Sequence, residues 1–107
     1  MDTNDATCLP YLKALSDDTR WQIVQSLISS NAPMTLGELA TKLDISNYKA
    51  SRHVSVLEEV GILETKKAGR RKFLSVAESY REHIESGKEA REVLNLGCCS
   101  FEFPQEQ

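Results

Sequence analysis

The stretch TLGELATKLDISNYKASRHVSVLEEV, residues 35–60, decides the fold of this chain. Thr35 is followed three residues later by Glu38, the spacing of a capping box, and this predicts the start of a short helix. Ser46 is a good N-cap for a second helix. The apolar residues of that second helix fall on one face: Ala50, Val54 and Leu57. The letters DIS between the helices predict a tight turn. A short helix, a tight turn and a longer helix with a polar outer face are typical of a helix-turn-helix.

The flanking segments extend this pattern. Residues 62–76, ILETKKAGRRKFLSV, change to a strand-like period around a basic turn and predict a β-hairpin, the wing of a winged helix-turn-helix. Residues 7–15 and 16–30 predict helices upstream. Residues 78–96, with apolar positions near a 3.5-residue spacing, predict a last helix ended by Gly97. We therefore expect a mostly α fold with a small β-hairpin, forming one domain over residues 1–107, with the helix-turn-helix at 35–60 and the wing at 62–76.

Composition narrows the class of protein. At 107 residues the chain fits one domain, and it contains no apolar run long enough to span a bilayer. The acidic, polar start MDTNDATC is unlike a secretory signal or a transit peptide, so we expect a cytoplasmic protein without a membrane partner. The sequence shows no glycine-rich phosphate loop, nucleophile elbow or metal-hydrolase motif, and we expect no enzymatic activity.

The distribution of charge points to a nucleic acid. The net charge is −3, yet residues 44–74 hold seven basic side chains against four acidic ones, between two acidic ends. The outer face of the helix after Ser46 mixes hydroxyls, an amide and cations, which suits a helix lying in a major groove. A solvated helix with a charge run after it is the simpler alternative. The turn, the apolar register and the basic hairpin in the correct order favour the DNA-binding interpretation.

Three segments together resemble the ArsR/SmtB family of winged-helix repressors: ALSDDTRWQIVQSL, LGELATKLDIS and SNYKASRHVSVLEEVGILETKKAGRRKFLSV. The resemblance covers roughly residues 9–96. It implies a homodimer formed by the first and last helices, at 7–15 and 78–96, that binds a roughly two-fold symmetric operator in double-stranded DNA and is released by an inducer. Carried over by position, the residues that read DNA are Ser46, Asn47, Tyr48, Lys49, Ser51, Arg52 and His53, with Arg70, Arg71 and Lys72 in the wing. From the apolar stripe alone, His53 faces either way.

Two inducer sites of that family do not fit this chain. A zinc site on the last helix needs paired Asp/His and His/Glu positions, and here only His83 with Glu82 and Glu85 is available. A Cys-x-Cys pair at the start of the short helix is replaced by Thr35, Leu36 and Gly37. The identity of the inducer is therefore undecided. A winged-helix module that binds proteins and senses no ligand is an alternative function.

The cysteines are the remaining candidates for a sensor. Three cysteines in a reducing compartment argue against a structural disulfide framework. Cys98 and Cys99 offer two soft ligands for As(III) or another soft metal, and Cys8 offers a third if the terminal helices pack together as in the family dimer. A redox thiol switch is the alternative, with Cys8–Cys98 or Cys8–Cys99 as the better disulfide because a Cys98–Cys99 ring is strained. In a third interpretation Cys99 only packs, since Cys99, Phe101 and Phe103 alternate onto one face of an extended tail.

Overall fold

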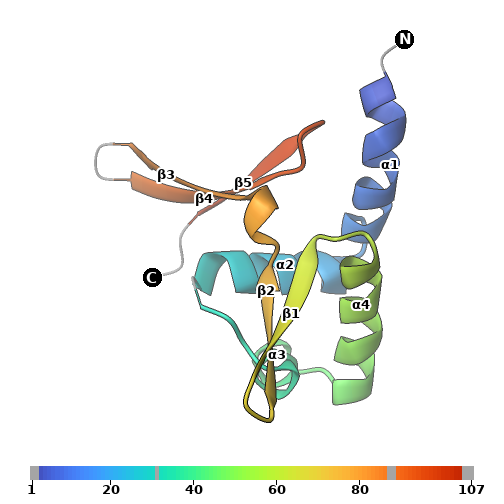
Figure 1. Ribbon diagram of the computed structural model, residues 1–107, viewed down its shortest axis with the longest axis vertical. Coiled ribbons are helices and arrows are strands. Elements are labelled where there is room, and N and C mark those ends of the chain that lie inside the picture. The colour runs from blue at the N-terminus through green and yellow to red at the C-terminus, as the bar shows by residue number, and fades with distance from the viewer. Residues whose placement is uncertain (1–2, 31, 87–88, 105–107) are drawn as a thin grey trace.

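A computed structural model describes residues 3–30, 32–86 and 89–104 (Figure 1). Four helices come first, followed by a two-stranded hairpin, a 3-10 turn and a three-stranded sheet. The helices are α1 (Thr3–Leu15), α2 (Asp18–Ser30), α3 (Leu36–Leu43) and α4 (Asn47–Glu59). The remaining elements are β1 (Leu63–Ala68), β2 (Arg71–Val76), η1 (Glu78–Tyr80), β3 (Arg81–Ser86), β4 (Glu89–Asn95) and β5 (Ser100–Pro104). None of the helices in the described ranges is long and apolar enough to cross a membrane.

The predicted helix-turn-helix is confirmed by its caps. The Thr35 hydroxyl accepts the backbone N–H of Glu38 at 3.2 Å, and the Glu38 carboxylate accepts the N–H of Thr35 at 2.8 Å. Asp44 ends α3 in the left-handed region, at φ 56°, and the Ser46 hydroxyl accepts the N–H of Lys49 at 3.0 Å. These caps satisfy backbone donors and carbonyls that a helix end leaves unpaired. Local sequence alone is thus enough to set the turn between α3 and α4.

The predicted wing is confirmed as well. β1 and β2 pair antiparallel from Leu63 opposite Val76 to Ala68 opposite Arg71. Gly69 takes φ +66° in the connecting turn, a conformation that L side chains rarely adopt. Leu74 exchanges backbone hydrogen bonds with Met34, which ties the hairpin to the segment between α2 and α3. The hairpin is therefore anchored at its base, and its tip extends away from the core (Figure 1).

A single apolar core joins these elements. Four α2 side chains that are at most 1% exposed form its centre: Ile23, Val24, Leu27 and Ile28. They pack with buried residues of α3, α4 and the hairpin, including Leu39, Leu57, Ile62 and Leu74. Each such side chain contributes about 1.5–3 kcal/mol by leaving water. This burial holds α4 against α2 with its polar side outward.

The predicted helix over residues 78–96 is wrong. After the short η1 turn the chain forms β3 and β4, and β5 adds a third antiparallel strand. Alternate residues then face α2, so Leu94 is fully buried, Phe103 is 2% exposed, and Phe101 is half-buried. The helical stripe that suggested a helix includes Ile84, which the structure leaves 40% exposed. Burial of the alternating set against α2 therefore overrides the helical preference of this charged segment.

Aromatic and ionic contacts fasten the sheet to α2. The Trp21 ring meets Phe101 edge-on at 5.4 Å and Phe103 at 5.2 Å between ring centroids. Glu92, only 1% exposed, receives hydrogen bonds from Arg81 Nε at 3.1 Å and from the His83 imidazole. Arg81 also donates to the carbonyl of Ile28, one of the last carbonyls of α2. The predicted extended tail with Phe101 and Phe103 on one face is confirmed as β5.

Candidate DNA-binding surface and cysteine cluster

The exposed side of α4 carries the polar residues predicted to read DNA. Ala50, Val54 and Leu57 are at most 4% exposed and turn toward the core. The opposite side exposes Asn47, Tyr48, Lys49, Ser51, Arg52 and Ser55. Ser46 is also exposed, but its hydroxyl caps the helix by accepting the N–H of Lys49. The structure thus brings all but one of the predicted helix residues to one solvent-facing surface.

Tyr48 and Arg52 hold each other on that surface. The Arg52 Nη1 donates to the Tyr48 hydroxyl at 3.0 Å, and its guanidinium carbon lies 5.7 Å from the centroid of the Tyr48 ring. Tyr48 is 71% exposed. The four-residue spacing puts the two side chains on neighbouring turns of α4. Because they support each other, the Arg52 guanidinium is oriented before any ligand arrives.

His53, the predicted DNA residue of uncertain direction, points inward. Its side chain is 19% exposed, and its Nδ1 lies 3.1 Å from Arg20 Nη1 and 3.8 Å from an Asp17 carboxylate oxygen. Arg20 also donates from Nε to the carbonyl of Ala14 at 2.6 Å. The backbone N–H of Arg20 lowers the pKa of Asp17, because it stabilises the charged carboxylate. Nothing in the sequence pointed to Arg20, whose partners Ala14 and His53 lie on α1 and α4. His53 therefore links α4 to α2.

The wing places its cations beside α4. Arg70, Arg71 and Lys72 are exposed at and beside the turn, and Lys66 and Lys67 are exposed on β1. The wing tip, α3 and the N-terminal end of α4 lie at the same end of the molecule (Figure 1). A groove of about 480 Å³ separates wing and helix, lined on its polar side by Ser51, Ser55, Glu58, Thr65, Lys67 and Lys72. The Thr65 hydroxyl donates to the Glu58 carboxylate across one edge of this groove. The two predicted parts of the DNA-binding surface are therefore adjacent.

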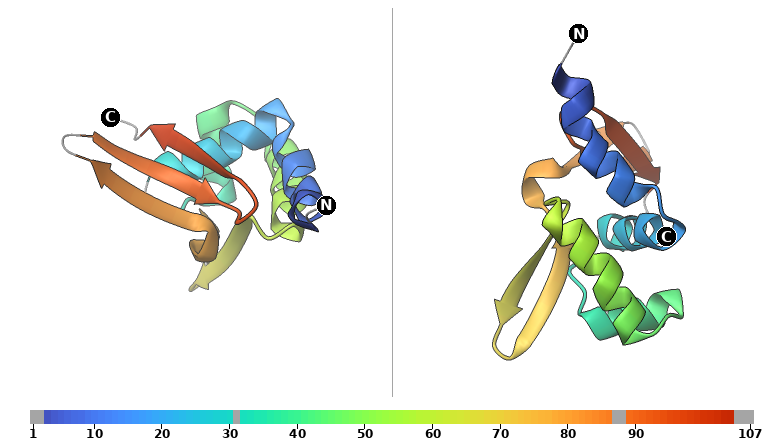
Figure 2. Two further views of the ribbon diagram at one scale, coloured as in Figure 1. Left: turned by 90° about the horizontal axis from the view of Figure 1, so that it is seen from above. Right: turned by 90° about the vertical axis from the view of Figure 1, so that its right-hand side faces the viewer.

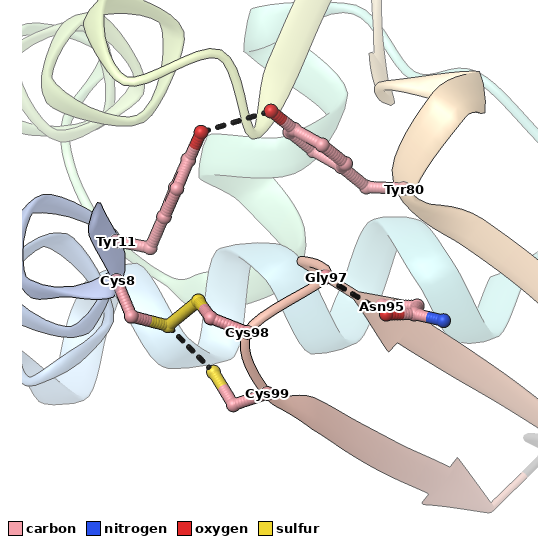
Figure 3. Close-up of a disulfide and its surroundings, with 7 residues drawn as sticks. All are labelled: Cys8, Tyr11, Tyr80, Asn95, Gly97, Cys98 and Cys99. Carbon is pink, nitrogen blue, oxygen red and sulfur yellow. Dashed lines mark hydrogen bonds between the residues drawn. A yellow bond between two sulfur atoms is a disulfide. The ribbon is translucent and has the colours of Figure 1, made fainter. Parts of the chain in front are cut away.

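α1 and the turn between β4 and β5 lie at the end of the molecule opposite the wing tip (Figure 2). The three cysteines on these segments meet there (Figure 3). Cys8 of α1 is bonded to Cys98 in the turn between β4 and β5, with an S–S distance of 2.04 Å. Cys99 carries a free thiol whose Sγ lies 3.0 Å from Cys8 Sγ. All three sulfurs lie within 4.8 Å of one another. Cys8 is 4% exposed, whereas Cys98 and Cys99 are half-buried.

This cluster bears on each of the predicted roles of the cysteines. The expectation excluded a structural disulfide framework but left room for one redox disulfide, and one bridge joins residues 90 positions apart. Of the two pairings predicted for a redox switch, Cys8–Cys98 and Cys8–Cys99, the structure contains Cys8–Cys98, and its action as a switch stays a prediction. Cys99 also packs against the core, as the packing interpretation expected, so packing and a place in the cluster coexist. The zinc site that did not fit the sequence is separate from this cluster, because its only histidine, His83, lies on β3 and is hydrogen-bonded to Glu92.

A tyrosine pair stands beside the cysteines (Figure 3). The Tyr11 and Tyr80 hydroxyls share a hydrogen bond of 2.9 Å, and the two rings meet edge to face at 5.8 Å. The hydrogen bond with Tyr11 raises the pKa of Tyr80, and partial burial acts in the same direction. Tyr11 lies three residues after Cys8, so helical spacing places both on one side of α1. This spacing to Cys8 is visible in the sequence for Tyr11, but nothing comparable marks Tyr80. The tyrosine pair was therefore not predicted.

Known proteins share the DNA-binding part of this arrangement. A family model described as a helix-turn-helix domain matches residues 15–66. The uncharacterized HTH-type transcriptional regulator YceK of Bacillus subtilis is 38% identical over 76 residues, which cover 71% of this chain and 76% of that protein. The arsenical resistance operon repressor of Escherichia coli is 41% identical over 62 residues, 58% of this chain and 52% of that protein. The solved structure of HlyU from Vibrio cholerae has a TM-score of 0.67 at 28% identity, covering 74% of this chain and 84% of that one.

The fold, the polar face of α4 and the basic wing define a winged helix-turn-helix DNA-binding regulator of transcription. Within that class, the chain belongs to the ArsR/SmtB family. The helix-turn-helix match ends at residue 66 and begins at residue 15. All three cysteines therefore lie outside the matched segment, on the elements that flank it.

Proposed function

We propose that this chain is a homodimeric transcriptional repressor of the ArsR type, which is released from operator DNA when its cysteine cluster changes state. The main support for DNA binding is that two surfaces, one on α4 and one on the wing, lie next to each other at one end of the molecule. The exposed polar face of α4 and the cationic tip of the wing lie side by side there. A protein that acts on chromosomal DNA in this way works in the cytoplasm.

Each part of this surface has its own role on DNA. The N-terminal half of α4 enters the major groove, where Asn47, Tyr48 and Arg52 reach base edges. The DNA backbone phosphates are held by hydroxyl and cationic side chains: Ser46, Lys49, Ser51, Arg70, Arg71 and Lys72. His53 contributes by fixing α4 against Arg20 of α2, which supports the reading helix from behind. Sequence reading and phosphate binding thus come from separate side chains.

Dimerisation supplies the second half of the surface. One helix-turn-helix makes few phosphate contacts, and two copies about 34 Å apart fit half-sites one DNA turn apart. The family expectation of a dimer through two terminal helices cannot apply in full, because residues 78–96 form strands rather than a helix. The first helix remains: Leu9 and Leu12 of α1 are 52% and 39% exposed and stand one turn apart. We assign this apolar strip to the dimer interface.

A thiol switch is the better supported sensor. In the cytoplasm thiols are kept reduced, and disulfides there are commonly transient, catalytic or redox-sensing. The Cys8–Cys98 bridge ties α1 to the C-terminal sheet, so its formation or loss changes how the proposed dimer helix is held. Such a change alters the spacing of the two α4 helices in a dimer, and DNA affinity depends on that spacing.

A soft metal or metalloid is the second candidate, and the three converging sulfurs favour it. Thiolates from Cys8, Cys98 and Cys99 form the donor set that As(III) prefers, and they already lie within 4.8 Å of one another. Cys8 and Cys98 must first be reduced, because a disulfide has no thiolate to offer. Oxidation and metalloid binding therefore exclude each other at this cluster, and arsenite release that persists in oxidised protein would rule out this candidate.

The salt dependence of DNA binding tests the proposed repressor most simply. Each neutralised phosphate adds about −0.9 to the slope of log K against log salt concentration, so a dimer whose four phosphate-binding cations per protomer make eight contacts gives about −7. A flat response to salt, or no binding to duplex DNA from the chain's own promoter, favours the protein-binding module instead. Double alanine substitution of Arg70 and Arg71 should make the slope shallower by about 2 per protomer.

A further inference from the structure

The sulfur of Cys8 has two sulfur neighbours (Figure 3). It is bonded to Cys98 Sγ and lies 3.0 Å from the free thiol of Cys99. Thiol–disulfide exchange begins when a thiolate attacks one sulfur of a disulfide, and its rate depends on access to that sulfur. Here the attacking group already touches the sulfur that it would attack.

We propose that Cys99 is an exchange thiol, so that the disulfide of Cys8 moves between Cys98 and Cys99. Cys99 loses its proton to solvent, and its thiolate attacks Cys8 Sγ. The Cys8–Cys99 bond forms as the Cys8–Cys98 bond breaks, and the bonding electron pair leaves on the Cys98 sulfur, which then takes up a proton. Nothing is oxidised or reduced overall. This step deepens the thiol switch proposed above and rests on it.

The turn between β4 and β5 explains how two adjacent residues reach one sulfur. In an extended strand, successive side chains point to opposite faces. Here Gly97 takes φ +90°, its N–H donates to the Asn95 side-chain oxygen at 2.9 Å, and the N–H of Leu96 donates to the carbonyl of Cys99 at 2.9 Å. This bend turns both Cys98 and Cys99 toward Cys8 (Figure 3).

Burial gives the exchange a consequence for regulation. Cys8 is 4% exposed and is shielded from reagents, whereas Cys98 and Cys99 are both half-buried. Oxidants and small thiols therefore meet the turn first, and either turn cysteine is then resolved by the same buried partner. We infer that Cys98 and Cys99 are alternative partners, each sufficient to close the switch.

Disulfide mapping of the full-length chain tests the exchange. The protein is oxidised with hydrogen peroxide, its free thiols are labelled with N-ethylmaleimide, and tandem mass spectrometry locates the label on Cys98 or Cys99. Wild type should carry label on both positions in different molecules. In Cys98→Ser, a Cys8–Cys99 disulfide should form at a rate comparable to that of the wild-type disulfide. Cys8→Ser is the matched control, in which both turn cysteines should accept label.

Label confined to Cys99 in wild type would overturn the exchange, as would a folded Cys98→Ser variant that keeps both thiols free. The wild-type labelling needs no variant, so it decides the question even where a substitution unfolds the protein. These measurements are made without DNA, so they test the disulfide exchange separately from the proposed thiol switch. Exchange without an effect of oxidation on DNA binding would contradict only the proposed switch, and DNA release with label confined to Cys99 would contradict only the exchange.

Discussion

The helix-turn-helix with its wing and the C-terminal sheet specify their structures in different ways. In the first region, residues 35–76, caps, turns and apolar stripes act between residues close in sequence. In the second, residues 78–104, stability comes from distant partners: Trp21 against Phe101 and Phe103, and Cys8 against Cys98. The difference suits their proposed tasks. A surface that reads DNA benefits from a rigid local frame, and a sensor benefits from contacts between distant elements, because losing one of them moves an element.

The largest expected effect lies in the C-terminal region. Phe103→Ala removes a ring that is 2% exposed and packed on Trp21, and we expect it to lower the free energy of unfolding by about 3–5 kcal/mol. Phe101→Ala, at a half-buried position of the same strand, should cost clearly less. Urea unfolding measures both. Equal and small losses for the two variants would mean that the sheet does not depend on its contact with α2.

The DNA-binding surface should respond without a change in stability. Arg52→Ala should weaken binding to promoter DNA by about 1–3 kcal/mol, or roughly 5- to 150-fold, if the guanidinium reads a base. The matched control is Arg91→Ala, which removes a half-buried arginine paired with Glu102 on the sheet and should leave DNA affinity unchanged. Fluorescence anisotropy with labelled DNA measures both. Unfolding of the Arg52 variant would show that this arginine is structural.

A smaller effect tests the local frame. Thr35→Ala deletes the hydroxyl of the capping box and should lower the free energy of unfolding by about 1 kcal/mol. Thr41→Ala, at an exposed position within the same helix, removes a hydroxyl of the same kind without removing a cap. Thermal or urea denaturation compares them. A loss no greater in the Thr35 variant than in the Thr41 variant would contradict the role given to the cap.

The smallest effect is a pH dependence at the tyrosine pair. The pKa of Tyr80 is raised, so the fold favours its neutral form. That contribution is complete below the ordinary pKa of tyrosine, about 10, and is lost as the pH rises through the higher pKa of the folded protein. In Tyr11→Phe the hydrogen bond is gone, and Tyr80 should ionise at lower pH. Absorbance near 295 nm follows the ionisation, and an unchanged titration would contradict the assigned cause.

The sequence was sufficient where its signals are local. Thr35 with Glu38, Ser46 and the basic hairpin predicted α3, α4 and the wing, and each is confirmed. It failed over residues 78–96, because charged residues at helical spacing satisfy a helix and a strand pattern equally well. The choice between them depends on Trp21, more than fifty residues away. One signal against a helix was Gly87, within the predicted helix, because glycine is unfavourable in a helix interior.

The candidate sites divide in the same way. The DNA-facing residues of α4 and the wing followed from periodicity and charge, with His53 as the position that periodicity left undecided. Cysteine counting in a reducing compartment argued against a disulfide framework and left the pairing open between Cys98 and Cys99, because it could not weigh the proximity of α1 to the turn at Gly97. Arg20 and Tyr80 were missed because their partners come from other elements of the fold. Contacts of this kind are set by tertiary packing.

The proposed control of DNA binding by the cysteine cluster acts from the opposite end of the molecule. Its most direct test compares DNA affinity of reduced and peroxide-oxidised protein, in wild type and in the double variant Cys98→Ser with Cys99→Ser. Oxidation should weaken wild-type binding at least about tenfold, equivalent to 1.4 kcal/mol. The double variant should bind as tightly as reduced wild type in both conditions. Equal affinity of reduced and oxidised wild type, or release of the double variant by peroxide, would contradict the account.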